Sequence, residues 1–117
     1  MVTSDSFREF LSEQLAELGH VTMRRMFGKT GVFCDGVMFG MVTDDTLYFR
    51  TDPRNTPDFE AAGMSPFTYR RDGREVALGY WTVPAEILDE GDRLAQWAEK
   101  AYAAALGKAA GRGRRKR

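Results

Sequence analysis

The chain has 117 residues, of which 43% are hydrophobic and one is a cysteine. This length predicts a single domain with one core, and the lone Cys34 excludes an internal disulfide and fits a reducing compartment. The N-terminal residues lack a basic start followed by an apolar run, and no segment approaches the roughly 18 apolar residues of a membrane span. We therefore expect a cytoplasmic protein with no membrane partner.

The formal net charge of zero hides an uneven distribution. Residues 1–107 hold eleven basic and seventeen acidic side chains, whereas residues 108–117 hold six basic side chains and no acid. We expect an acidic domain over 1–107 and a disordered basic tail over 108–117, because the tail has nothing to bury. Phosphate neutralisation makes six tail residues candidate nucleic-acid contacts: Lys108, Arg112, Arg114, Arg115, Lys116 and Arg117. The alternative is a tail that improves solubility or binds the acidic domain.

The first predicted element is an amphipathic helix. Its apolar residues recur at steps of three and four: Phe7, Phe10, Leu11, Leu15 and Leu18. Ser6 and Glu9 fit a capping box, and a start at Ser4 is the alternative. Gly19 is the predicted end of the helix.

Residues 22–51 change to the two-residue alternation of strands. We expect four strands, at about 22–27, 31–34, 37–43 and 46–51. Asp35-Gly36 predicts a tight type I′ hairpin turn, and Asp44-Asp45 is a weaker signal of the same kind.

The second half begins where Asp52-Pro53 ends the sheet. Asn55 or Thr56 can cap a short helix that Gly63 closes. A second hairpin then pairs 66–70 with 75–83 around Asp72-Gly73.

Two helical segments complete the chain. Pro84 opens a short turn through Leu88, and a longer helix runs from about Asp92 to Leu106. A single stripe of this last helix is the predicted buried face: Leu94, Trp97, Ala98, Ala101 and Ala105.

The order α, four β, α, two β, α has short links between its strands, which predicts an antiparallel sheet. The fold class is α+β: a two-layer domain with about five to six strands and helices packed on one face.

An ordered set of short segments carries a family resemblance. The set begins with Arg-Arg-Met-Phe-Gly at 24–28, Gly-Val-Phe at 31–33 and Asp-Gly-Val-Met-Phe at 35–39. It continues at 45–50, 59–63, 66–69 and 80–84. Together these segments resemble the N-terminal domain of the TfoX/Sxy competence regulators over about residues 6–106.

The resemblance implies an antiparallel α+β domain similar to the secretion-chaperone-like folds. It also implies a regulatory, non-enzymatic role, since better-known relatives assist transcription together with the cyclic-AMP receptor protein. Those regulators carry a second, helical domain beyond the part that this sequence resembles. The family has no agreed catalytic residues to carry over.

The richest candidate surface lies on the predicted strands. Arg24 and Arg25 point to opposite faces of one strand, so one guanidinium can meet a partner's carboxylate or a phosphate. The alternative is that one is solvated and the other pairs with an internal carboxylate. Met38 and Phe39 belong to a dense set of Met and Phe that is either core or an adaptable binding surface. Arg24, Arg25, Met38 and Phe39 form the candidate partner surface.

Other polar residues give no sign of chemistry. His20 has no partners at metal-ligand spacing, Cys34 has no activating neighbour, and Asp44-Asp45 lacks further acids at a calcium-loop spacing. We expect no catalytic residue, metal or cofactor, and no enzyme. The expected partner is a protein, with the transcription machinery or a second copy of this chain as candidates, and the tail makes nucleic acid the alternative partner.

Overall fold

The computed structural model describes residues 4–26 and 28–115, and their side chains up to residue 107. The first half holds α1 (Asp5–Gln14), the 3₁₀ turn η1 (Ala16–Leu18), β1 (Val21–Met26), β2 (Lys29–Cys34), β3 (Val37–Thr43) and β4 (Thr46–Arg50). The second half holds α2 (Thr56–Ala61), β5 (Pro66–Arg71), β6 (Arg74–Thr82), α3 (Ala85–Leu88) and α4 (Gly91–Arg115).

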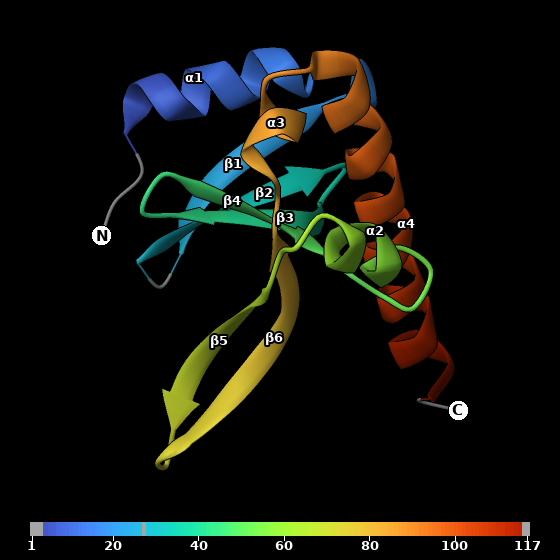
Figure 1. The fold of residues 1–117 in the computed structure, drawn as a ribbon. Helices are drawn as coiled ribbons and strands as arrows, with labels where there is room; N and C mark the ends of the chain where they lie inside the picture. The colour runs from blue at the N-terminus through green and yellow to red at the C-terminus, as the bar shows by residue number, and fades with distance from the viewer. Residues whose placement is uncertain (1–3, 27, 116–117) are drawn as a thin grey trace.

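The six strands form one open antiparallel sheet in the order β1-β2-β3-β4-β6-β5. Helices cover one face, with α4 running along the sheet and α1 and α3 near one end (Figure 1). The β5–β6 hairpin projects away from the other strands like an arm (Figure 1). The predicted α+β class with an antiparallel sheet is confirmed.

All three predicted hairpin turns have the backbone that a type I′ turn needs. The φ angles are 50° and 81° at Asp35 and Gly36, and 53° and 77° at Asp72 and Gly73. Asp44 and Asp45, the weaker signal, have φ of 54° and 53°. Both central residues of each turn therefore have positive φ, which matches the right-handed twist of the paired strands.

The first helix begins, and the last helix ends, at a residue other than the predicted one. Ser4, and not Ser6, caps α1, and its Oγ accepts a hydrogen bond from the Phe7 amide at 3.2 Å. The Ser6–Glu9 capping box is therefore wrong, and the alternative start is right. The predicted end of the last helix at Leu106 is also wrong, because the backbone of α4 continues through Gly107 to Arg115. The proposed division into a domain and a disordered tail stays a prediction.

The core lies between α4 and the sheet. The buried stripe of α4 contains Leu94, Ala98, Ala101 and Ala105, as predicted, with Trp97 partly buried beside it. Alanines on this stripe let the helix approach β3 and β4 closely, as helix-to-sheet packing requires. Among the described residues, none of the helices combines the length and the apolar character needed to cross a bilayer.

Candidate functional site

Strand register separates the two faces of the sheet. Arg25 pairs with Thr30, and Thr30 pairs with the fully buried Val42, so this row lies on the face that the helices cover. The next row joins Arg24, Gly31 and Met41 and lies on the opposite, helix-free face. Arg24 and Arg25 therefore occupy opposite faces, as the alternation of a strand demands.

The Arg24 guanidinium lies over an aromatic ring. Its Cζ is 4.8 Å from the ring centroid of Phe33 on β2. Across the described part of the chain, neither Arg24 nor Arg25 takes part in a salt bridge. The internal ion pair considered for one of them is therefore not found there, and a cation–π contact holds Arg24 on the helix-free face.

A β-bulge in β3 brings two methionines to the same face. Phe33 pairs with Met38 and Gly31 pairs with Met41, so β3 has one more residue than β2 over this stretch. Strict alternation would place Met38 and Met41, three residues apart, on opposite faces, but the extra residue removes that difference. Both methionines therefore lie on the helix-free face.

The same bulge directs Phe39 into the core. Phe39 is fully buried and packs against Phe49, at 5.8 Å between ring centroids, and against Tyr102 of α4, at 6.3 Å. Its inclusion in a partner surface is wrong for this conformation, because the side chain is enclosed between β3 and α4. Of the four candidates, Arg24 and Met38 share the helix-free face, while Arg25 and Phe39 do not.

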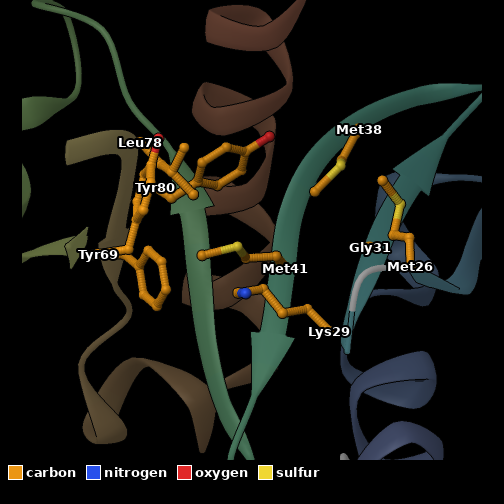
Figure 2. Close-up of a pocket in the computed structure, with 9 residues that line it drawn as sticks. Met26, Lys29, Gly31, Met38, Met41, Tyr69, Leu78 and Tyr80 are labelled. Carbon is orange, nitrogen blue, oxygen red and sulfur yellow. The ribbon is translucent and has the colours of Figure 1, made fainter. Parts of the chain in front are cut away.

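The helix-free face contains a hollow of about 570 Å³. The first strands supply Met26, Lys29, Gly31, Met38 and Met41. The β5–β6 arm supplies Phe67, Tyr69, Leu78 and Tyr80. Figure 2 shows Tyr69, Leu78 and Tyr80 on one side, Met26 and Met38 on the other, and Met41 with Lys29 between them. We call this feature the helix-free hollow.

The side chains of the hollow are apolar or aromatic, with one exception. Met41 is only 2% exposed although it lies on the uncovered face, so it forms the bottom of the hollow. Leu78 is 38% exposed at the opening. Burial raises the pKa of Tyr80, with the Arg50 charge opposing that change, so its phenol is neutral at physiological pH. Lys29 is the only charged residue among the described lining residues.

Two further cation–π contacts border the hollow. The Lys29 Nζ lies 5.5 Å from the ring centroid of Phe67, and this ring packs edge-on against Tyr48 at 5.2 Å. The Arg50 Cζ lies 5.2 Å from the ring centroid of Tyr80. Cations on β1, β2 and β4 are thus held on aromatic rings around one apolar surface.

Gly79 explains how the arm bends. It interrupts β6 with φ of 82°, and the register between β5 and β6 shifts nearby. Arg50 lies against this glycine and donates from Nη1 to the carbonyl of Leu78 at 3.1 Å. A Cβ on Gly79 would be 3.0 Å from that Nη1. A residue without a side chain is therefore needed where the arm leaves the sheet.

The remaining candidates lie away from the hollow. Cys34 is 4% exposed, and burial followed by the nearby charge of Asp35 raises the pKa of its thiol. A buried thiol with a raised pKa is typical of an unreactive, structural cysteine. His20 is exposed. In residues 4–26 and 28–107, no group of three or more His, Cys, Asp or Glu side chains is placed to hold a metal ion.

The six basic residues of 108–117 have no described side chains. The backbone of 108–115 belongs to α4, but the positions of Lys108, Arg112, Arg114, Arg115, Lys116 and Arg117 toward a ligand lie outside the described structure. Their assignment as nucleic-acid contacts stays a prediction.

The sequence interpretation missed the hollow itself. Two signals could have indicated the features that shape it: Gly79 inside an otherwise regular strand, where the arm bends, and Gly40 beside Phe39, at the bulge of β3. A glycine in a strand interior often marks a bulge or a close approach. A Cβ on Gly40 would lie 3.1 Å from the Tyr48 carbonyl oxygen and 3.3 Å from the Phe49 ring.

Comparison with known proteins gives one family. The model of the TfoX N-terminal domain matches residues 13–105. Protein Sxy of Escherichia coli (strain K12) is 30% identical over 105 residues, which cover 90% of this chain and 50% of that protein. DNA transformation protein TfoX1 of Aliivibrio fischeri (strain ATCC 700601 / ES114) is 33% identical over 67 residues, which cover 57% of this chain and 32% of that protein. The matches thus span half or less of the length of each relative.

Proposed function

Because this chain belongs to the TfoX N-terminal domain family of competence-regulator-like proteins, we propose that it is a non-enzymatic regulatory domain that acts by binding another protein. The observation that carries this proposal is the helix-free hollow, an apolar surface on an uncovered sheet face in the part of the chain that matches the family. Uncovered apolar surfaces of this kind are typical of protein interaction sites.

The chemistry of the hollow supports binding over catalysis. Its polar groups are one ammonium group and two phenols, from Lys29, Tyr69 and Tyr80. A general acid–base pair or an activated nucleophile needs two titratable groups within hydrogen-bond reach of one another. The described side-chain hydrogen bonds include no such pair among these three residues. Methionine-rich surfaces instead adapt their shape to a partner.

Site-specific photocrosslinking in living cells tests this proposal. A benzoylphenylalanine at Tyr69 samples the hollow, and one at Arg93, on the exposed side of α4, is the matched control. We expect discrete crosslinked proteins from position 69, and loss of those products when the apolar opening is changed by Leu78→Asp. The same variant should alter the transcript levels that depend on this chain. If position 69 gives no product beyond that of position 93, and association is absent in light scattering, the proposal fails.

Nucleic-acid binding is the second candidate function, favoured by the six basic residues in 108–117. If six phosphates are neutralised, the logarithm of the binding constant should fall with the logarithm of the salt concentration with a slope of at most about −5. A mobility-shift series over salt should compare the full chain with one that ends at Gly107. Salt-sensitive binding that disappears on truncation supports this function, whereas binding that survives assigns it to arginines of residues 1–107.

A further inference from the structure

The helix-free hollow combines an apolar bottom with a basic border. Lys29 is part of its lining, and Arg24 and Arg50 lie on the same face over Phe33 and Tyr80. Among the described residues, none of these three cations forms a salt bridge, and no lining residue is acidic. The basic border contrasts with residues 1–107 as a whole, where acids outnumber bases by seventeen to eleven.

The spacing of the cations favours an extended occupant. Arg24 is on β1 and Arg50 is on β4, which is three strand positions away in the sheet. Neighbouring strands lie about 4.8 Å apart, so these two positions are separated by at least roughly 14 Å, since Arg50 also lies two residues beyond Tyr48, the β4 residue in register with Arg24. One carboxylate on a small molecule cannot meet both cations. Acidic residues seven to ten positions apart on a helix span roughly 10 to 15 Å and can meet both.

The location of the hollow favours a helix over an added strand. The hollow opens on a sheet face, between β1, β2 and β3 on one side and the β5–β6 arm on the other. The strands β2 and β3 at its bottom already exchange their main-chain hydrogen bonds with a neighbour on each side. A segment that binds on a sheet face receives no ladder hydrogen bonds, so it must satisfy its own backbone groups. A helix does this internally and presents one apolar stripe to a groove.

We propose that the helix-free hollow binds an amphipathic helix of a partner protein, whose apolar stripe fills the hollow and whose flanking carboxylates pair with Arg24, Lys29 and Arg50. This inference rests on the proposed function, because it names the chemistry of the partner. Methionines at the bottom and side of the hollow, Met41 and Met38, adapt to the apolar side chains of the helix. The basic border selects the acidic flanks.

A displayed library of amphipathic helices tests the proposal. Every member carries a leucine stripe, and the flanking positions are varied among Glu, Gln and Lys. Selection uses the full chain as the target. We expect enrichment of Glu at the flanks and weaker binding as salt is raised. Recovery of helices without acidic preference, or recovery of no helix at all, would overturn the proposal.

Charge reversal on adjacent residues supplies the matched control. Arg24→Glu changes the helix-free face, whereas Arg25→Glu changes the next residue of the same strand on the covered face. Arg24→Glu turns an attraction into a repulsion at an exposed pair, so it should lower the affinity for the selected Glu-flanked peptide by roughly fivefold to tenfold. We expect Arg25→Glu to change its affinity by less than about twofold, and Arg24→Glu to gain affinity for the Lys-flanked peptide. Equal effects of both variants contradict the assignment.

A small apolar acid is the competing occupant, since hollows of this size also take ligands of roughly drug size. Dodecanoate serves as its probe. If dodecanoate binds with the Leu78→Asp sensitivity expected of the hollow and no library helix does, the hollow is a small-molecule site and our assignment is wrong. Crosslinks at Tyr69 together with a library that shows no acidic preference would refute this inference and leave the proposed function standing.

Discussion

The arm that closes one side of the hollow should depend on Gly79 more than on the other glycines with positive φ. Gly79→Ala places a Cβ 3.0 Å from Nη1 and 3.2 Å from Cζ of Arg50, at a residue with φ of 82°. An alanine with left-handed backbone costs about 1–2 kcal/mol in free energy of unfolding. Displacement of Arg50 should add about 1 kcal/mol, because it weakens the bond to the Leu78 carbonyl and the contact with Tyr80.

Gly73→Ala separates these two contributions. Gly73 has φ of 77°, close to that of Gly79, but a Cβ there meets nothing within 4 Å. Both variants should therefore be destabilised by the cost of a left-handed alanine. Only Gly79→Ala should be destabilised further, by the displacement of Arg50. At roughly 2 cal/mol/K of unfolding entropy per residue, 1 kcal/mol corresponds to about 4 °C in Tm for this chain.

Urea unfolding followed by tryptophan fluorescence measures the difference. The expected order of stability is wild type, then Gly73→Ala, then Gly79→Ala. In an Arg50→Ala background, Gly79→Ala should cost only the backbone contribution, since the side chain that it would displace is already absent. Equal losses at Gly73 and Gly79, or a penalty that persists without the Arg50 side chain, would refute the reasoning.

Three further predictions concern the groups around this region. Asn55→Ala should lower the free energy of unfolding by about 2–3 kcal/mol in a urea titration, because the 2% exposed amide bonds the Arg50 carbonyl and the Asp52 amide. A hydrogen bond from the Arg54 guanidinium lowers the pKa of Asp52 below its usual 3.8. The ionised Asp52 carboxylate therefore stabilises the folded chain above pH 3.8, and this stabilisation is lost as the pH falls through the lowered pKa. Asp52→Asn should therefore destabilise the protein at pH 7, and the difference from wild type should shrink in thermal melts below pH 3.8. Native Cys34 should react with a disulfide reagent more than roughly tenfold more slowly than the urea-unfolded chain, as buried thiols do; equal rates would show that the thiol is accessible.

Local rules were enough to predict most of the sheet. The three turns depend on Asp and Gly residues whose preferences act within four residues, and the structure places each turn where the sequence indicated. The strand limits follow from the same turns. The capping of α1 was harder to predict, because Ser4 and Ser6 both fit the local pattern. Ser4 also donates its amide to Asp45, 41 residues away, which no local rule includes.

The site could be predicted only in part, because its geometry depends on pairing between strands. Arg24 and Met38 were identified from alternation and composition. Met41 was not, because it reaches the same uncovered face as Met38 only through one extra residue in β3, while Phe39 faces the core. The buried Phe39 ring is enclosed by Phe49 and by Tyr102, a residue 63 positions later in the chain. Such contacts between distant residues select which strand residue is bulged, and sequence alternation does not contain them.

The position of the family match bears on which feature carries a shared function. The match to the TfoX N-terminal domain ends at residue 105, so it includes every strand and the whole helix-free hollow, and it excludes the basic residues from 108 onward. A property shared through the matched domain would depend on residues 13–105, whereas nucleic-acid contact through the basic residues from 108 onward would not rest on this match. Gly31 lines the hollow, where a Cβ would lie 2.8 Å from the Phe33 ring, and Gly79 lets the arm bend beside Arg50. Every described lining residue belongs to a strand, so the shape of the hollow follows from the sheet and its β5–β6 arm.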